Sequence, residues 1–286
     1  MIQDARPTIE PAPAQRQDYY VSIDGARLRY RDEGKGPAVI FVHGWALDLE
    51  MWEPQVAELA AAYRVIRLDR RGFGLSSGNP SLICDVTDLR ALCRHLQLQR
   101  VALVGMSQGA RVVLQLTSLA PSMVSCLVLD GAPRIGPVRE QGDPQELPYE
   151  HYRRVAQTQG VAAFRREWAE HPLVKLRTEN MHTQELMAGM LARYSGSDLM
   201  EPLPPPPLVT TLQMIQSIES PILVIGGALD LDSRKRAADE LMLELPRAER
   251  TEIQGAGHLC NLDNQRAYSS ALRNFLDRHA AAQPNH

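Results

Sequence analysis

The chain has 286 residues, of which 44% are apolar and 23% charged, and its formal net charge is −3 at pH 7. This length fits one large α/β domain or two small ones, and the apolar share is enough for a sizeable core. Acidic and basic residues are interspersed, which argues against nucleic acid or an anionic membrane surface as a partner.

Residues 1–17 are rich in Pro, Ala and Gln, and we expect them to form a flexible arm. This stretch has no apolar segment typical of a signal peptide, and nowhere does an apolar run approach the ~18 residues of a membrane span. The four cysteines show neither a C-x-x-C pair nor metal-ligand spacing. We therefore expect a cytoplasmic protein with reduced, mostly buried thiols. The cysteines are Cys84, Cys93, Cys126 and Cys260.

Predicted strands and helices alternate in the first half of the chain. The strands are expected at residues 19–23, 26–31, 38–42, 64–68, 101–104 and 126–129, and the helices at 50–62, at 81–96 and after residue 107. The Asp24-Gly25 pair between the first two strands is a strong hairpin signal. Alternation after an antiparallel start predicts an α/β fold with a mostly parallel sheet and helices on both faces.

This alternation stops between residues 133 and 207. Amphipathic helical patterns occupy 149–159, 161–168 and 183–194, and four successive prolines end the segment. A strand at 221–227, a helix to residue 245, a strand at 249–253 and a helix at 262–278 then complete the pattern. We predict a flexible arm at 1–17, a core made of 18–132 and 208–286, and a helical cap inserted at 133–207.

The pentapeptide 105–109 reads G-x-S-x-G and lies between a buried strand and a helix. In that context the pattern predicts a nucleophile elbow, with Ser107 exposed on a strained turn. Gly105 and Gly109 lack a Cβ atom, so neighbouring backbone can approach the turn closely. The N–H of Gln108, at the start of the helix, would face an oxyanion formed beside the serine.

A histidine and three carboxylates follow predicted strands at the same edge of the sheet. His258 lies in a glycine-rich loop after the last strand and could act as a general base for the serine. Asp230 follows the preceding strand and could orient the imidazole. Asp130 and Asp232 remain alternatives for this acid, although Asp232 is favoured as the N-cap of the next helix. Cys260, two residues after the histidine, is interpreted as a small apolar filler.

The sequence resembles the α/β-hydrolase fold superfamily in four features. They are the elbow, the order Ser107, Asp230, His258 along the chain, the His-Gly-Trp loop at 43–45 and the segment 69–76. The resemblance is to its capped, cofactor-free branch of esterases, haloperoxidase-like enzymes and C–C hydrolases. It covers about residues 18 to 280.

The resemblance implies a catalytic triad of Ser107, His258 and Asp230. It also implies an oxyanion hole made by the backbone N–H groups of Trp45 and Gln108, and no cofactor or metal.

The same resemblance implies structural roles for His43 and Asp69. In two places the sequence departs from the pattern of many members: Ala46 and Ala110 stand where glycine is common. We expect both small replacements to be tolerated.

A serine at the elbow argues against haloalkane dehalogenase or epoxide hydrolase chemistry, which needs a carboxylate there. The expected activity is hydrolysis of a small carboxylic ester or related acyl compound through an acyl-serine. A C–C hydrolase using the same triad and a non-catalytic ligand-binding or regulatory protein remain alternatives. The candidate substrate-contacting residues are Trp45, Trp168, Met187 and Met190, all of which also fit plain core packing.

Overall fold

The computed structural model describes residues 17–136, 147–201, 208–245 and 247–280. The strands are β1 (Tyr19–Ile23), β2 (Ala26–Glu33), β3 (Ala38–Val42), β4 (Arg64–Leu68), β5 (Val101–Met106), β6 (Val124–Asp130), β7 (Ile222–Gly227) and β8 (Glu249–Ile253). The helices are α1 (Glu53–Leu59), α2 (Leu82–His95), α3 (Gln108–Leu119), α4 (Tyr149–Gln159), α5 (Val161–Trp168), α6 (Met181–Arg193), α7 (Ser197–Met200), α8 (Leu212–Gln216), α9 (Asp232–Glu244), α10 (Cys260–Asp263) and α11 (Gln265–His279). Two short 3-10 helices are η1 (Leu49–Trp52) and η2 (Pro121–Met123).

The eight strands form one sheet in the order β1-β2-β4-β3-β5-β6-β7-β8. β2 is antiparallel to both β1 and β4, and the remaining neighbours are parallel. The predicted hairpin turn is confirmed: Asp24 and Gly25 have φ angles of 43° and 77°, the left-handed region that a tight two-residue turn requires. The predicted α/β class, with a mostly parallel sheet, is therefore correct.

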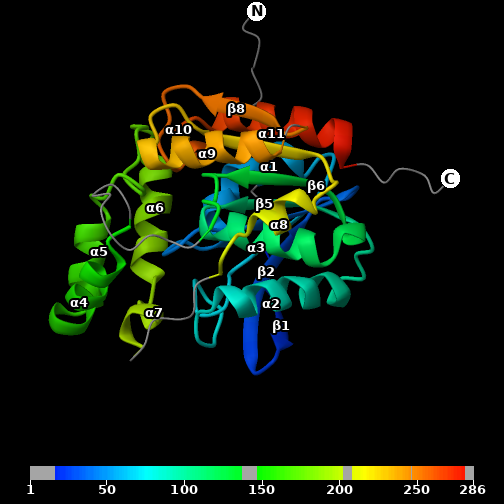
Figure 1. Ribbon diagram of the computed structural model, residues 1–286. Coiled ribbons are helices and arrows are strands. Elements are labelled where there is room, and N and C mark those ends of the chain that lie inside the picture. The colour runs from blue at the N-terminus through cyan, green and yellow to red at the C-terminus, as the bar shows by residue number, and fades with distance from the viewer. Residues whose placement is uncertain (1–16, 137–146, 202–207, 246, 281–286) are drawn as a thin grey trace, which may run out of the picture.

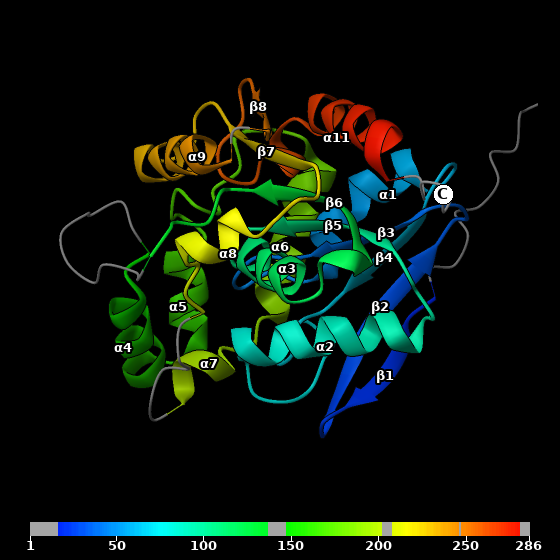
Figure 2. The same cartoon turned by 45° about the vertical axis from the view of Figure 1, so that its right-hand side comes forward.

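Helices cover both faces of the sheet (Figures 1 and 2). α2, α3, α8 and α9 contribute to one apolar cluster, and α1 and α11 to another. β5 lies between the two: Val101 and Leu103 point into the first cluster, and Ala102 and Val104 into the second. Burial on both faces explains why this strand is a continuous apolar run.

Helices α4 to α7 lie between β6 and β7 in the sequence and gather at one side of the sheet, the left side in Figure 1. Residues 147–201, which hold these helices, are called the cap below, and the other described residues are called the core. The predicted helices at 149–159 and 161–168 are confirmed, and the third spans Met181–Arg193. The proposed arm lies outside the described residues except for residue 17, and 137–146 and 202–207 of the proposed cap lie outside them as well.

The structure corrects the role predicted for Asp232. The N-cap position of α9 belongs to Leu231, and Asp232 is the first residue of the helix. Its side chain is exposed and pairs with Lys235 at 3.0 Å, one turn later. Asp232 therefore lends its negative charge to the first helical turn without capping the helix through its side chain.

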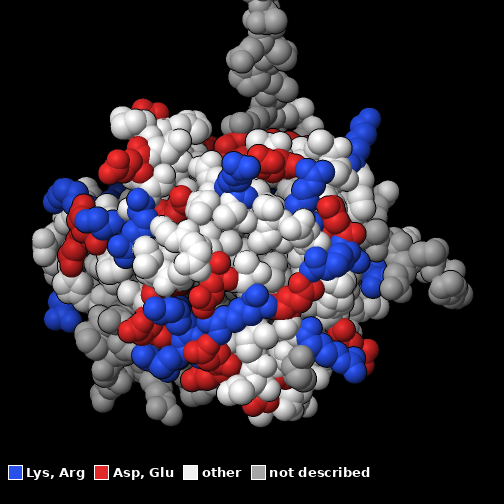
Figure 3. All heavy atoms as spheres, turned by 90° about the horizontal axis from the view of Figure 1, so that it is seen from above, with Lys and Arg blue, Asp and Glu red and all other residues white. Residues whose placement is uncertain are grey.

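The remaining expectations on composition concern the surface and the thiols. Basic and acidic side chains are mixed on the face shown in Figure 3. All four cysteines are free thiols; three are buried and Cys84 is half-buried. In the described part of the chain, no helix is long and apolar enough to span a membrane.

Candidate active site

Ser107 is the single residue between β5 and α3, and its backbone is strained. Its φ and ψ angles are 53° and −108°, in a region that costs a non-glycine residue about 1–3 kcal/mol. The turn is tight because a Cβ atom on Gly105 would lie 2.4 Å from the carbonyl oxygen of Gly109. Glycine at 105 thus permits the immediate reversal from strand to helix, which leaves Ser107 half-buried at the turn.

The loop after β3 packs directly against this turn. A Cβ atom on Gly109 would come within 2.2 Å of the Val42 carbonyl oxygen, and one on Gly44 within 2.6 Å of Met106 Sδ. Both glycines permit close approach, so the 43–46 loop lies beside Ser107.

His258 and Asp230 form a buried pair. His258 Nδ1 lies 2.8 Å from Asp230 Oδ2, and the two side chains are 3% and 4% exposed. Burial alone would raise the pKa of Asp230, but the imidazole and the Leu231 N–H, which donates to Oδ1, hold the pKa below its ordinary value. The carboxylate thus stays ionised, fixes the Nδ1–H tautomer and leaves Nε2 free to accept a proton.

Two glycines allow this pair to form. A Cβ atom on Gly227, at the end of β7, would lie 2.0 Å from the carbonyl oxygen of Gly257. One on Gly131 would lie 2.6 Å from Cε1 of His258. The loop carrying His258 therefore rests directly on the carboxyl ends of β6 and β7.

Ser107 and His258 are linked through the end of β6. The Ser107 N–H donates to the Asp130 carbonyl oxygen at 2.8 Å, and the next residue, Gly131, runs so close to the imidazole that there is no room for a Cβ atom. In the described part of the chain no hydrogen bond joins Ser107 Oγ to His258 Nε2.

Of the three carboxylates left open by the sequence, only Asp230 bonds to the histidine. Asp130 is fully buried, and its Oδ1 accepts from Cys260 Sγ at 3.3 Å. Burial raises the pKa of Asp130 to about 7, against the lowering effect of the Cys260 thiol and the Tyr268 hydroxyl. Cys260 is buried, as expected for a small apolar filler, but its thiol also donates a hydrogen bond to the buried Asp130 carboxyl group. The sequence did not predict this hydrogen bond.

The two predicted oxyanion donors are backbone N–H groups without backbone partners. Neither Trp45 nor Gln108 donates its N–H to a carbonyl oxygen within the described residues. Gln108 begins α3, so its N–H points out of the helix end. The side-chain Oε1 of Gln108 accepts a hydrogen bond from Arg70 at 3.0 Å, which holds the Gln108 side chain in place.

His43 and Asp69 anchor the loops beneath the site. Arg70 N–H donates to His43 Nε2 at 2.9 Å, and His43 Nδ1 donates to the Gly44 carbonyl at 2.7 Å. Burial lowers the pKa of His43 well below its ordinary value, with the Arg70 charge adding to the effect. Asp69 accepts from the N–H groups of Leu49 and Leu75, both at 2.8 Å.

Trp45 belongs to an aromatic cluster that joins core and cap. Its ring centroid lies 4.9 Å from that of Trp168 and 5.5 Å from that of Phe164. Its indole Nε1–H donates to Asp198 Oδ2, in α7, at 2.6 Å. The Trp45 side chain is therefore mainly a packing and anchoring group.

The three candidate substrate residues of the cap are also core residues. Trp168, Met187 and Met190 are 2%, 5% and 1% exposed. Met187 lines a groove of about 270 Å³ whose rim includes the exposed residues Glu170 and Ala188. This groove opens on the cap surface and touches neither Ser107 nor His258.

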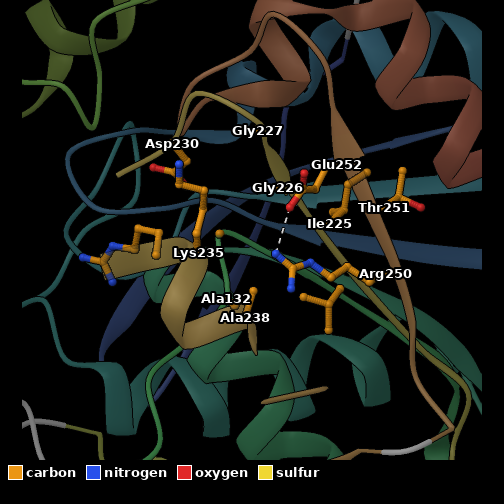
Figure 4. A pocket seen from close by; sticks show the side chains of 13 residues that line it. Ala132, Ile225, Gly226, Gly227, Asp230, Lys235, Ala238, Arg250, Thr251 and Glu252 are labelled. Carbon is orange, nitrogen blue, oxygen red and sulfur yellow. Dashed lines mark hydrogen bonds and ion pairs between the residues drawn. The ribbon is translucent and has the colours of Figure 1, made fainter. Parts of the chain in front are cut away.

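A second cavity lies beside Asp230, between the ends of β7 and β8 and the start of α9 (Figure 4). Its volume of about 20 Å³ holds little more than one water molecule. Arg250, which lines it, is paired with Glu252 at 2.9 Å. The cavity is too small for a substrate.

Sequence reasoning missed three cap residues around the site. His171 stacks on Trp168 with a centroid distance of 4.7 Å, and burial lowers its pKa, with the His258 charge adding to the effect. Arg193 pairs with Asp48 at 2.8 Å, and Asp198 holds Trp45. No motif marks these residues, because their roles depend on how the cap docks.

No group of three or more His, Cys, Asp or Glu side chains within the described ranges could hold a metal ion.

Comparison with known proteins agrees with this architecture. The family model described as "alpha/beta hydrolase fold" matches residues 37–265. A protein of Mycobacterium tuberculosis provisionally named non-heme bromoperoxidase BpoC is 29% identical over 256 residues, 87% of this chain and 97% of the other. A pimeloyl-[acyl-carrier protein] methyl ester esterase of Pectobacterium carotovorum is 28% identical over 221 residues, 72% and 81% of the two chains.

Solved structures share the fold at lower identity. An enol-lactonase from Burkholderia xenovorans superposes with a TM-score of 0.74 at 23% identity, covering 91% of this chain and 100% of the other. An esterase from Thermogutta terrifontis gives 0.73 at 24% identity, covering 93% and 99%. The family match spans most of the chain, and the chain therefore belongs to the α/β-hydrolase fold family.

Proposed function

We propose that the protein is a serine hydrolase that cleaves a small carboxylic ester or related acyl compound. Ser107 is the nucleophile, His258 the general base and acid, and Asp230 the residue that orients the histidine. The observation that carries the proposal is the buried His258–Asp230 hydrogen bond at the sheet edge where Ser107 occupies its strained turn.

The reaction follows from these positions. Ser107 Oγ attacks the carbonyl carbon of the substrate while His258 Nε2 takes the hydroxyl proton. The imidazolium then returns the proton to the leaving oxygen as the bond to the acyl carbon breaks. Water, deprotonated by the same nitrogen, then attacks the carbonyl carbon of the acyl-serine. The imidazolium protonates Ser107 Oγ as its bond to the acyl carbon breaks, which releases the carboxylic acid and restores Ser107 and His258.

The backbone N–H groups of Trp45 and Gln108 would receive the negative charge that develops on the carbonyl oxygen. In the described part of the chain neither N–H has a backbone acceptor. Gln108 directly follows Ser107 and adds the positive end of the α3 dipole, and the loop that carries Trp45 packs against Met106 through Gly44. Loss of one such donor typically costs about 3 kcal/mol of transition-state stabilisation.

The names of the relatives support an ester substrate. The Pectobacterium relative is named as a methyl ester esterase, and the Thermogutta and Burkholderia structures as an esterase and an enol-lactonase. C–C bond hydrolysis would use the same three residues and remains the alternative chemistry. A non-catalytic binding role would leave the strained serine and the buried pair without a use.

Steady-state kinetics on an ester panel tests the proposal. We would compare the wild type, Ser107→Ala and His258→Ala on three kinds of substrate. These are p-nitrophenyl esters of two to eight acyl carbons, a lactone, and a meta-cleavage product as the substrate for C–C bond hydrolysis. Hydrolysis of at least one ester, lost about 10³-fold or more in both variants, supports the proposal. An esterase rate unchanged in Ser107→Ala contradicts it.

A further inference from the structure

The 43–46 loop, which carries Trp45, is held by the carboxylate of Asp198 in α7. Trp45 and Asp198 are 6% and 3% exposed, and the indole Nε1–H donates to Asp198 Oδ2 at 2.6 Å. Tyr194 donates its hydroxyl to the other carboxylate oxygen, Oδ1. The two partners of this core–cap bond are 153 residues apart in the chain.

Asp198 is an unusual group for this place. Among the described residues no cation forms a salt bridge with it, and burial raises its pKa, against the lowering effect of the Trp45 and Tyr194 hydrogen bonds. A buried carboxylate is costly unless donors satisfy both of its oxygens. Here an indole, which can only donate, and a phenol supply one donor to each oxygen.

The loop that Asp198 holds is itself strained. Ala46, directly after Trp45, has a φ angle of 55°, a left-handed conformation that costs an L-residue about 1–2 kcal/mol. Such a conformation persists when surrounding contacts determine it. On the core side, His43 supplies these contacts through Arg70 and Gly44. On the cap side, Asp198 accepts a hydrogen bond from the indole of Trp45, the residue directly before Ala46.

We propose that Asp198 is a positioning residue whose hydrogen bond to the Trp45 indole fixes the Trp45 backbone N–H in the oxyanion hole. The hole is then complete only when α7 is docked on the core. This inference rests on the proposed hydrolase function. Asp198 contacts no reacting atom and acts through the Trp45 side chain.

The test is a double-mutant cycle on the Trp45–Asp198 bond. Trp45→Phe removes the indole donor but keeps the backbone N–H and an aromatic ring, and Asp198→Ala removes the acceptor. Asp198→Asn keeps an amide oxygen that can accept from the indole. The control is Tyr149→Phe, which removes a 3.0 Å hydrogen bond to the Asp198 backbone carbonyl and leaves the Trp45–Asp198 bond intact.

For the best ester of the panel, kcat, KM and Tm would be measured for each variant. We expect kcat to fall about tenfold or more in Trp45→Phe and in Asp198→Ala, with KM within about threefold. The double variant falls no further than the single variants, since both remove the same bond. Asp198→Asn recovers most of kcat, and Tyr149→Phe keeps the wild-type kcat.

Unchanged kcat in Trp45→Phe, or multiplicative losses in the double variant, would overturn the positioning role. If Asp198→Ala does not fold, the other two variants still test the proposal. The positioning role then requires a lower kcat in Trp45→Phe and a kcat near that of the wild type in Asp198→Asn. Ser107→Ala separates the two proposals. If it abolishes hydrolysis while Trp45→Phe does not lower kcat, only the positioning role fails; if it has no effect, the proposed function fails.

Discussion

The carbonyl oxygen of Gly257 lies so close to Gly227 that a methyl group on Gly227 would come within 2.0 Å of it. The Ala256 carbonyl would be 2.3 Å away, so backbone rather than a flexible side chain blocks the space. The absence of one methyl group at the end of β7 thus allows the His258 loop to reach Asp230.

Gly227→Ala should therefore displace His258 from Asp230. We expect kcat/KM to fall at least about 100-fold and the protein to lose about 2–3 kcal/mol of stability, because the new Cβ atom meets rigid backbone. Ester kinetics and urea unfolding would measure both effects.

Gly226→Ala is the matched control, one residue earlier on the same strand. A Cβ atom there meets nothing within 4 Å. Wild-type kinetics for this variant are expected. Equal losses in both glycine variants would show that strand distortion, and not the contact with Gly257, is responsible.

Asp230→Asn should leave the fold intact and lower kcat/KM by about 10³–10⁴-fold. An amide favours the wrong imidazole tautomer and cannot stabilise the imidazolium. The control is Asp232→Asn, because the Asp232 side chain is exposed and pairs with Lys235, one turn later on the helix. The assignment of the acid would be wrong if Asp232→Asn were the damaging change.

Asp130 should make the protein less stable as pH rises towards neutrality. Its pKa is about 7 in the folded protein and 3.8 ordinarily, so between these values the folded state binds a proton that the unfolded state has lost. The free energy of unfolding then decreases with rising pH in this window. Each unit of pKa difference is worth about 1.4 kcal/mol. As the pH rises from 5 to 8, the free energy of unfolding of Asp130→Asn should therefore increase by about 1–3 kcal/mol relative to that of the wild type.

Urea unfolding of the wild type and Asp130→Asn across this range would measure the gain. Burial also raises the pKa of Asp69 to about 7 and that of Asp85 to about 6, but both groups are present in both proteins and cancel in the difference. A pH-independent difference would mean that Asp130 titrates alike in the folded and unfolded states.

Much of the site was predictable because it depends on local sequence and strand order. The strained turn at Ser107 follows from a G-x-S-x-G sequence after a buried strand. Asp230 and His258 follow the last two strands of a parallel sheet, so both had to reach the same edge. Their catalytic roles stay predictions until the kinetics are measured.

What the sequence could not reveal depends on the docking of the cap. The Trp45–Asp198 bond joins two segments 153 residues apart, and no periodicity or motif relates them. The N-cap role predicted for Asp232 was wrong because Leu231 occupies that position and Asp232 already lies in the helix. Distant side-chain partners and exact helix starts both depend on tertiary contacts.

Arg193 should contribute to cap docking. It pairs with Asp48 at 2.8 Å and with Glu50 at 2.6 Å, and the Asp48 side chain is only 1% exposed. Arg193→Met leaves this buried carboxylate without its cation, so we expect a loss of about 1–2 kcal/mol, discounted because Arg193 itself is partly exposed.

Unfolding in urea would measure this loss, with Arg273→Met as the control. Arg273 forms an exposed pair with Asp277 at 3.9 Å, and its removal should cost less than about 0.5 kcal/mol. Equal effects of the two substitutions would argue against a specific role for Arg193 in holding the cap.

Covalent labelling of Ser107 tests the central claim most directly. Wild type and Ser107→Ala would be treated with a small fluorophosphonate and weighed intact by mass spectrometry. An activated serine displaces fluoride and retains the phosphonyl group, so we expect one adduct on the wild type and none on the variant. An unlabelled wild type, or equal labelling of both proteins, would contradict it.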